Sequence, residues 1–430
     1  MILKVKKSSN LNGNVRMPRS KTHSFRALIL ASLANGNSLI KYPKLSNDWY
    51  GAIKAMKMYG AEIKEIGSNI FQVKGVDGKL QTPDDVINVG NSGTMLAFIN
   101  GVAAACSGRS VITGDESIRN LRIVTKRLFT PYKELGIEII STKNDGLPPL
   151  MIKGQVNGGK ATMDGAGCQP VFSVLIASAL SQKPVDIFVK NPGETAYIDL
   201  LLYWFDKVGI KYENDNYKHY HFPGNSAPKP FKATIPFEWS APPYPLLAAV
   251  ISENSQITVK GMDDKDPYGD KFVLNTLLEM GAYIKKENGV LTAKSSKLHA
   301  IEVDMNIMPD QVPTIAVAAC FANGKTVIKN ALTARWKECD RITAICTELK
   351  KMGAKVFEKK DGLIINADGS WKLKGVELNG YNDHRMVLSL AVAALNAKGQ
   401  STISDAQMLE KSFETFVPDM QKAGAKFKLI

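Results

Sequence analysis

Hydrophobic and polar positions along the chain repeat one shape, and residues 341–357 carry its clearest copy. Apolar residues at helical spacing lead there to Gly353, and a short alternating stretch follows. A glycine directly after the last apolar turn is a common helix C-cap, because glycine adopts positive φ without a steric penalty. The pattern therefore predicts an amphipathic helix that ends at Gly353 and a strand after it.

The same shape recurs along the whole chain, with spacings of 76, 73, 72, 72 and 71 residues between the cap glycines, which are Gly60, Gly136, Gly209, Gly281, Gly353 and Gly424. A second helix, apolar nearly all round, precedes each copy, at residues 25–33, 95–105, 171–180, 244–251, 315–320 and 386–395. Helices without a polar face are expected to be buried. The sequence therefore predicts an α/β protein of six repeats, each a strand, buried helix, strand, exposed helix and two strands.

The length of 430 residues predicts at least two domains, and six repeats divide into three and three. A proline-rich segment, residues 223–236, interrupts the pattern between the third and fourth copies. It is the best candidate for an interdomain hinge, and the chain around Pro18 is a candidate for a second crossing.

The net charge of +14 permits three classes of partner: nucleic acid, an anionic membrane and small anionic substrates. The lysines are scattered over the predicted outer helices without a dense basic arm, which disfavours nucleic acid. No apolar run reaches the roughly 18 residues of a membrane span, and the first residues lack the apolar core of a signal peptide, which favours the cytoplasm. The five cysteines form no CxxC pair and fit reduced thiols.

Small anions fit best, because basic and hydroxyl residues recur at the predicted helix starts, where free N–H groups attract anions. Capping and surface ion pairs explain any one of these groups. Their recurrence at equivalent places of a repeated scaffold favours an anion site. His219 and His221 share one face of a predicted strand, but no third metal ligand is evident nearby, so we interpret them as structural.

Seven segments occur in the order of a known family: SKTHSFRALILASLANG, NVGNSGT, ITGDES, PDQVPTIAVAACFANG, RWKECDRI, YNDHRM and EKSF. By these motifs the whole chain resembles the enolpyruvyl transferases, and among them the EPSP synthases. The related UDP-N-acetylglucosamine transferases match less well, because their reactive-cysteine loop is absent. The resemblance implies a two-domain inside-out α/β barrel with three βαβαββ repeats per domain. The domains would be residues 19–229, and residues 230–430 together with 1–18, and they would close on the substrates.

The activity implied is transfer of the enolpyruvyl group from phosphoenolpyruvate to a hydroxyl of shikimate 3-phosphate. Phosphate is released, and the step belongs to aromatic amino acid biosynthesis by the shikimate pathway. The enzyme would be a cytoplasmic monomer that acts on small anions without a metal or an organic cofactor, and without nucleic acid or membrane partners.

The resemblance also implies roles for individual residues. Those expected to bind phosphoenolpyruvate are Lys21, Asn91, Gly93, Thr94, Arg122, Gln169, Arg341, Arg385 and Lys411. Those expected to bind the acceptor are Lys21, Thr22, Arg26, Cys168, Gln169, Tyr197, Asp310, Thr333 and Lys337. Proton transfer is assigned to Lys21, Asp310, Glu338 and His384.

Several positions depart from the family pattern. Ala97 stands where the family has an arginine, and Leu121 at a second arginine, which either Arg119 or Arg122 would replace. Serines that bind the acceptor phosphate are replaced by Gly167, Cys168 and Glu194, and an asparagine by Thr333. Since a glutamate repels a phosphate, two alternatives stay open: a paralogous enolpyruvyl transferase with another hydroxyl acceptor, and an inactive ligand-binding homologue.

Overall fold

The computed structural model describes residues 1–369 and 373–430 and divides into two compact units. The N-terminal unit is Arg19–Ile235, and the C-terminal unit combines Met1–Pro18 with Pro236–Ile430. The chain passes between the units at Pro18–Arg19 and at Ile235–Pro236. The second crossing lies after β14 (Lys232–Thr234), because β14 pairs in parallel with β3 (Asn37–Lys41) of the N-terminal unit.

The fold is mixed α/β, as predicted, and the described strands form sheets that share one pattern. In each strand order, the first two strands run parallel to each other. The third strand runs antiparallel to the second, and the fourth runs antiparallel to the third. In the N-terminal unit the orders are β14-β3-β5-β4, β6-β7-β9-β8 and β10-β11-β13-β12. The further strands there are β4 (Glu62–Gly67), β5 (Ile70–Lys74), β6 (Ile87–Asn88), β7 (Arg109–Thr113), β8 (Glu138–Ser141), β9 (Leu150–Lys153), β10 (Gly159–Asp164), β11 (Val185–Lys190), β12 (Glu213–Asp215) and β13 (His219–Phe222).

In the C-terminal unit the orders are β2-β15-β17-β16, β18-β20-β22-β21 and β23-β24-β1-β25, with β19 beside β20. These strands are β1 (Leu3–Lys6), β2 (Asn12–Val15), β15 (Gln256–Lys260), β16 (Tyr283–Glu287), β17 (Val290–Lys294), β18 (Leu298–His299), β19 (Glu302–Asp304), β20 (Ala322–Lys329), β21 (Lys355–Lys359), β22 (Gly362–Asp368), β23 (Glu377–Leu378), β24 (Gln400–Ile403) and β25 (Lys426–Leu429).

Two strands are exchanged between repeats that lie far apart in sequence. β2 precedes the first buried helix but pairs with β15 of the fourth repeat. β14 precedes the fourth buried helix but pairs with β3 of the first repeat. β1 completes the last sheet between β24 and β25. The first residues of the chain are therefore built into the C-terminal unit.

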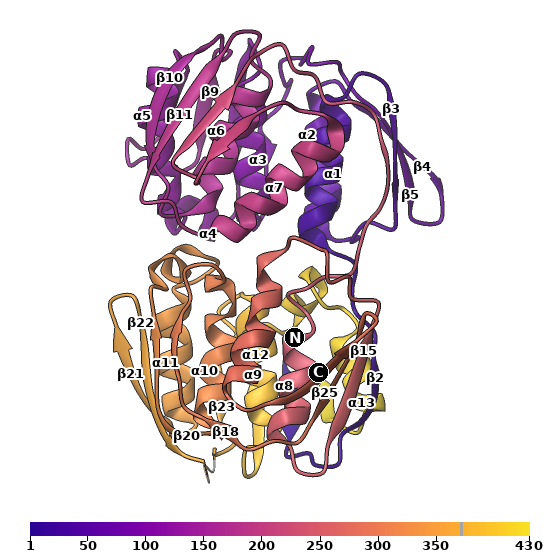
Figure 1. Cartoon of the computed structure of the whole chain (residues 1–430), viewed down its shortest axis with the longest axis vertical. Helices are drawn as coiled ribbons and strands as arrows, with labels where there is room; N and C mark the ends of the chain where they lie inside the picture. The colour runs from indigo at the N-terminus through magenta and orange to yellow at the C-terminus, as the bar shows by residue number, and fades with distance from the viewer. Residues whose placement is uncertain (370–372) are drawn as a thin grey trace. The chain divides into compact units, whose positions relative to one another are not determined.

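The helices predicted to be buried form the interior of each unit (Figure 1). They are α1 (Lys21–Leu33), α3 (Gly93–Ala103) and α6 (Cys168–Ala179) in the N-terminal unit, and α8 (Pro243–Ile251), α10 (Val312–Cys320) and α12 (His384–Ala394) in the C-terminal unit. α3 packs on α6 and α1, and α12 packs on α10 and α8. Each starts before its predicted apolar run. For example, the Ser92 hydroxyl accepts the Met95 N–H at 3.2 Å and begins α3 two residues early.

The Gly-capped helices lie outside this interior, and all six predicted cap glycines have positive φ, from 75° at Gly209 to 102° at Gly60 and Gly424. These helices are α2 (Asn47–Met58), α5 (Phe129–Glu134), α7 (Thr195–Val208), α9 (Val273–Glu279), α11 (Arg341–Lys351) and α13 (Phe416–Lys422). Short helices lie in the segments that lead into some of the longer helices. They are α4 (Glu116–Asn120), η1 (Ile123–Leu128), η2 (Gly269–Phe272), η3 (Pro309–Gln311), η4 (Leu332–Trp336) and η5 (Ala406–Lys411).

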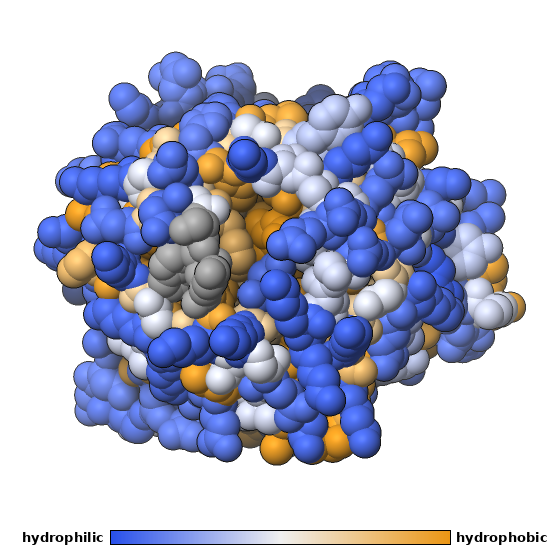
Figure 2. Space-filling model, turned by 90° about the horizontal axis from the view of Figure 1, so that it is seen from below, coloured by the Kyte–Doolittle hydropathy of each residue, from blue (hydrophilic) through white to orange (hydrophobic). Residues whose placement is uncertain are grey.

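Hydrophilic side chains cover most of the face shown in Figure 2, with apolar residues gathered in its hollow. Among the described residues, no helix combines the length and the apolar character needed to cross a membrane.

Candidate functional site

In the C-terminal unit, charged side chains from separate segments gather around the start of α11. We call them the charged cluster: Asp270, Asp310, Lys337, Glu338, Arg341, Asp383, Arg385 and Lys411. Cations and carboxylates alternate in it. Burying charges is costly unless opposite charges and hydrogen bonds compensate, and here each charge has such a neighbour.

Arg341 forms the centre of the charged cluster and is only 1% exposed. Its guanidinium donates to Asp383 at 2.7 and 3.2 Å, to Asp310 at 2.8 Å and to Glu338 at 2.6 Å. Burial by itself lowers the pKa of Arg341, but the three carboxylates outweigh burial and raise that pKa well above its usual value. The guanidinium is therefore fixed in place and fully charged.

Capping chemistry places this arginine and the next one. The carboxylate of Asp340 caps α11 by accepting the Thr343 N–H at 3.1 Å, so Arg341 is the first residue of the helix. Asp383 caps α12 in the same way and accepts the Arg385 N–H at 2.8 Å. Asp383 thus fixes a helix start and orients Arg341 with the same carboxylate.

Asp310 connects the cations of the cluster. Its carboxylate lies 2.8 Å from Arg341, 3.2 Å from Arg385 and 3.4 Å from Lys337, and 22% of its side chain is exposed. Burial by itself raises the pKa of Asp310, but the charges of Lys337, Arg385 and Arg341 outweigh burial and lower it below the usual range. Asp310 is therefore an ionised carboxylate at the open side of the cluster.

The remaining members extend the cluster in two directions. Arg385 donates to the fully buried Asp270 at 2.9 Å, and Gln311 donates to the same carboxylate at 3.1 Å. Lys411 lies 3.2 Å from Glu338 and is 8% exposed. Side chains from η2, η3 and η5 thereby meet residues at the starts of α11 and α12.

His384 is buried beside the cluster, with its Nδ1 atom 3.8 Å from the Asp383 carboxylate. Thr333 is half-buried on η4, which packs against η3, the turn that carries Asp310. His384 and Thr333 therefore lie on segments next to the charged cluster.

In the N-terminal unit, contacts between residues at the helix starts bring four of these starts together: α1 with α7, α7 with α6, and α6 with α3. We call the residues at or beside these starts the helix-start cluster: Thr22, Arg26, Gly93, Arg122, Cys168, Gln169, Glu194 and Tyr197. Several N-termini at one place create a positive potential that suits an anion.

Arg26 is 1% exposed and lies beside two stacked aromatic rings, with its guanidinium carbon 5.3 Å from the Phe98 centroid and 4.9 Å from the Phe172 centroid. It donates to the backbone carbonyls of Thr22 at 3.1 Å and Tyr197 at 3.2 Å. Arg26 therefore ties the start of α1 to the start of α7.

Arg122 lies against the start of α3. A Cβ atom at Gly93 would come within 2.7 Å of the Arg122 guanidinium carbon and 2.9 Å of the Gln169 amide nitrogen. Only glycine fits at that approach without a shift of these groups. Arg122 is 1% exposed, whereas Arg119 is half-buried and donates to the carbonyl of Gly114. Of these two arginines, the structure brings Arg122 into the helix-start cluster.

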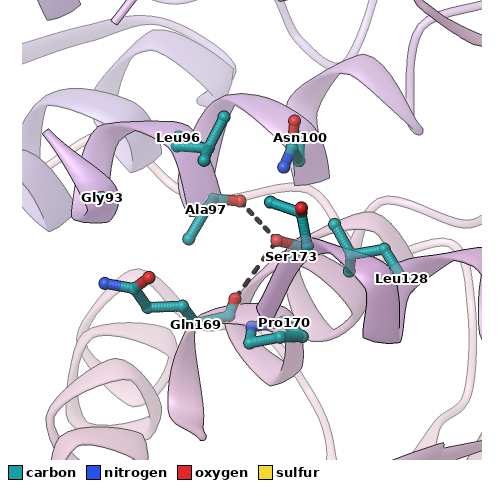
Figure 3. Close-up of a pocket in the computed structure, with 9 residues that line it drawn as sticks. Gly93, Leu96, Ala97, Asn100, Leu128, Gln169, Pro170 and Ser173 are labelled. Atoms are coloured by element: carbon teal, nitrogen blue, oxygen red, sulfur yellow. Dashed lines mark hydrogen bonds between the residues drawn. The ribbon is translucent and has the colours of Figure 1, made fainter. Parts of the chain in front are cut away.

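Beside Gly93 lies a cavity of about 10 Å³, which is close to the room that one water molecule needs (Figure 3). Ala97 lines it, and the Ser173 hydroxyl donates to the carbonyls of Ala97 at 2.7 Å and Gln169 at 3.2 Å. At Ala97, where the resemblance led us to expect an arginine in the family, the structure has only this small space, which Ser173 also lines.

A larger hollow of about 520 Å³ lies in the same unit at the other ends of these helices, beyond the C-termini of α1, α3 and α6. Asp77, Ala105 and Gln182 are among its lining residues. Helix C-termini carry partial negative charge, so this end repels anions. The helix starts, and not the larger hollow, suit an anionic ligand.

Two predicted residues, Lys21 and Asn91, have other close partners. Lys21 lies 3.6 Å from the Asp48 carboxylate. The Asn91 amide donates to Asp115 at 2.9 Å and to Ser117 at 3.2 Å, so its nitrogen is engaged at the α4 start. Thr94 is half-buried in the first turn of α3.

No role was predicted for Asp270, Asp383 or Asp48, which the structure places against Arg385, Arg341 and Lys21. Asp383 lies inside the YNDHRM segment, so a motif pointed to it. No motif pointed to Asp270 or Asp48, because their partners lie far away in the sequence.

Comparison with known proteins gives a consistent result. The family model of EPSP synthase (3-phosphoshikimate 1-carboxyvinyltransferase) matches residues 5–420. The chain is 42% identical over 425 residues to a 3-phosphoshikimate 1-carboxyvinyltransferase of Acetivibrio thermocellus, covering 99% of both chains. It is 38% identical to that of Ruminiclostridium cellulolyticum over the full length of both. Its fold is similar to a solved EPSP synthase structure from Acinetobacter baumannii, with a TM-score of 0.82, 24% identity and 99% of each chain covered.

Proposed function

The chain belongs to the EPSP synthase family, and we propose that it transfers the enolpyruvyl group of phosphoenolpyruvate to a hydroxyl of shikimate 3-phosphate, with release of phosphate. The observation that carries this proposal is the charged cluster. Its buried arginines and lysines are fixed by carboxylates at helix starts, which suits a small, multiply charged anion.

In this proposal Arg341, Arg385 and Lys411 bind phosphoenolpyruvate and its departing phosphate, together with Lys21. Their positions support the role, because Arg341 begins α11, Arg385 lies in the first turn of α12, and they are held by Asp383 and Asp270. Fixed donors stabilise developing charge without having to reorganise during the reaction.

Residues of the helix-start cluster are proposed to complete substrate binding. Arg122, Gln169 and Gly93 are assigned to phosphoenolpyruvate with Asn91 and Thr94, and the burial of Arg122 supports it over Arg119. The acceptor is assigned to Lys21, Thr22, Arg26, Cys168, Gln169, Tyr197, Asp310, Thr333 and Lys337.

The reaction joins the acceptor hydroxyl oxygen to C2 of phosphoenolpyruvate, while a proton is added to C3 and the hydroxyl proton is removed. The C2–O bond to phosphate then breaks, a proton leaves C3, and the carbon–carbon double bond returns. Asp310, Glu338, Lys21 and His384 are the proposed proton carriers. Asp310 suits the base role because it is ionised, and entering anions that compete for its cations would raise its pKa.

We also propose that each unit is one domain of an inside-out α/β barrel, built of three βαβαββ repeats. The central position of the buried helices within each unit, with sheets outside them, supports this arrangement (Figure 1). We further propose that the protein is a cytoplasmic monomer that acts on small anions. No metal or organic cofactor is assigned to the reaction.

The direct test is phosphate release from phosphoenolpyruvate with shikimate 3-phosphate as acceptor. The proposal expects steady release that requires both substrates, and a large loss of kcat/KM in the Arg385→Ala variant. No release by the folded protein with both substrates present would refute it.

A further inference from the structure

Glu194 occupies an unusual place for a carboxylate, because its side chain closes the N-terminus of a buried helix. Its Oε2 atom accepts the backbone N–H of Cys168, the first residue of α6, at 2.9 Å. The N-cap residue of α6 is Gly167, which has no side chain to cap the helix. Glu194 is 1% exposed, so its carboxylate lies inside the unit and replaces the missing cap.

The backbone holds Glu194 in this position. The residue has the left-handed conformation, with φ of 53°, directly before the first residue of α7. Its carbonyl accepts the Tyr197 N–H at 3.0 Å, and the Tyr197 carbonyl accepts from Arg26 at 3.2 Å. Glu194 is thereby linked through one helical turn to a buried arginine of the helix-start cluster.

The position of the carboxylate is that of an anionic ligand. It meets the first amide of α6, one residue before Gln169, whose amide nitrogen lies close to Gly93 and to the Arg122 guanidinium. Helix N-termini and nearby arginines bind phosphates and carboxylates in proteins. A negative group of the protein already fills this place, so a second anion must either displace it or meet its repulsion at low dielectric.

We propose that Glu194 determines the acceptor preference of this chain by competing with the acceptor's anionic group for the start of α6. An acceptor that carries a phosphate there binds only when the Glu194 carboxylate leaves the Cys168 amide. An acceptor without the phosphate binds with the carboxylate in place. This inference rests on the proposed function, since it takes shikimate 3-phosphate as the phosphorylated acceptor and shikimate as its counterpart.

If the role of Glu194 is purely structural, a different result is expected. If Glu194 only closes the helix, its removal weakens α6 and affects both acceptors alike. If it competes with the acceptor phosphate, its removal improves binding of the phosphorylated acceptor alone. The ratio of the two affinities therefore separates the roles.

The experiment measures binding of shikimate 3-phosphate and of shikimate by calorimetry, for the wild type and for the Glu194→Gln and Glu194→Ser variants. Glutamine keeps the shape without the charge, and serine removes the competing group while leaving a hydroxyl. Glu213→Gln is the matched control, because it removes an exposed carboxylate of the same unit. Thermal unfolding shows which variants are folded.

We expect the preference for shikimate 3-phosphate over shikimate to rise at least tenfold in both Glu194 variants and to stay unchanged in Glu213→Gln. An unchanged or lower ratio in the folded variants, including an absence of binding of shikimate 3-phosphate, overturns the inference. Phosphate release in the same samples tests the proposed function separately. A wild type that binds the acceptors without turnover refutes the function, while the affinity ratio still decides the role of Glu194.

Discussion

The guanidinium of Arg341 donates to both oxygens of the Asp383 carboxylate, at 2.7 and 3.2 Å, and both side chains are almost completely buried. The pair joins the starts of α11 and α12, so one ion pair fixes two helix ends. A buried pair of this kind gives geometric precision more than stability.

Removal of Asp383 should therefore be costly, because Arg341 keeps its charge while losing the carboxylate that accepts two of its hydrogen bonds. We expect Asp383→Ala to lower the free energy of unfolding by about 3 kcal/mol, measured by urea denaturation. Glu377→Gln, which changes an exposed carboxylate of β23, should have little effect. Equal stability of the wild type and Asp383→Ala would show that the pair does not hold the helix starts.

Lys411 is buried beside Glu338 and is assigned to the phosphate of phosphoenolpyruvate. We expect Lys411→Ala to weaken phosphoenolpyruvate binding by about 2 kcal/mol, roughly thirtyfold in Kd, measured by calorimetry. Lys422→Ala is the control, since that side chain is 74% exposed. An unchanged Kd in Lys411→Ala would remove this lysine from the site.

Asp310 is assigned to proton transfer, and its amide analogue cannot accept a proton. We expect Asp310→Asn to lower kcat about 100-fold or more while KM for phosphoenolpyruvate changes much less. Steady-state kinetics with both substrates measure the two parameters. A kcat close to that of the wild type would assign the base role to another residue.

The lowered pKa of Asp310 also predicts how its stabilising effect depends on pH. A carboxylate whose folded pKa lies below its unfolded value of about 3.9 stabilises the fold above that value, and this contribution is lost as the pH falls toward the folded pKa. The stability advantage of the wild type over Asp310→Asn should be constant between about pH 5 and 7 and shrink below about pH 4. Denaturation of both proteins at several pH values measures it, and an advantage that grows in acid would contradict the assigned direction.

Gly93 leaves room for the Arg122 guanidinium and the Gln169 amide. We expect Gly93→Ala to displace these groups and to raise KM for phosphoenolpyruvate about tenfold or more, about 1.4 kcal/mol, with a smaller effect on kcat. Gly67→Ala serves as the control, because the nearest atom to its added Cβ lies at 3.7 Å. Unchanged kinetics would mean that Arg122 does not act on phosphoenolpyruvate.

The repeat, the buried helices and the cap glycines were predictable because each depends on a local pattern. The six cap glycines have positive φ as predicted, since only the last helical turn and the next residue decide it. The exchange of β2 and β14 was not predictable in detail, because strand pairing between distant repeats leaves no local signal.

In the candidate site too, features with a local pattern were predictable, whereas contacts between distant segments were not. Motifs identified Arg341, Arg385 and Lys411, but their carboxylate partners depend on contacts between segments far apart in the sequence. Glu194 appeared in the sequence only as a residue that departs from a pattern. Its bond to the Cys168 amide needed the structure, because α6 and α7 start 27 residues apart and meet only in the folded unit.

Phosphorus NMR can show whether the enzyme converts both substrates together. The wild type is incubated with equal amounts of phosphoenolpyruvate and shikimate 3-phosphate, and the phosphorus signals are followed over time. We expect the phosphoenolpyruvate signal to disappear, inorganic phosphate to appear in equal amount, and the acceptor signal to shift to that of its enolpyruvyl ether. Inorganic phosphate without a shifted acceptor signal, or no change in either substrate, would contradict it.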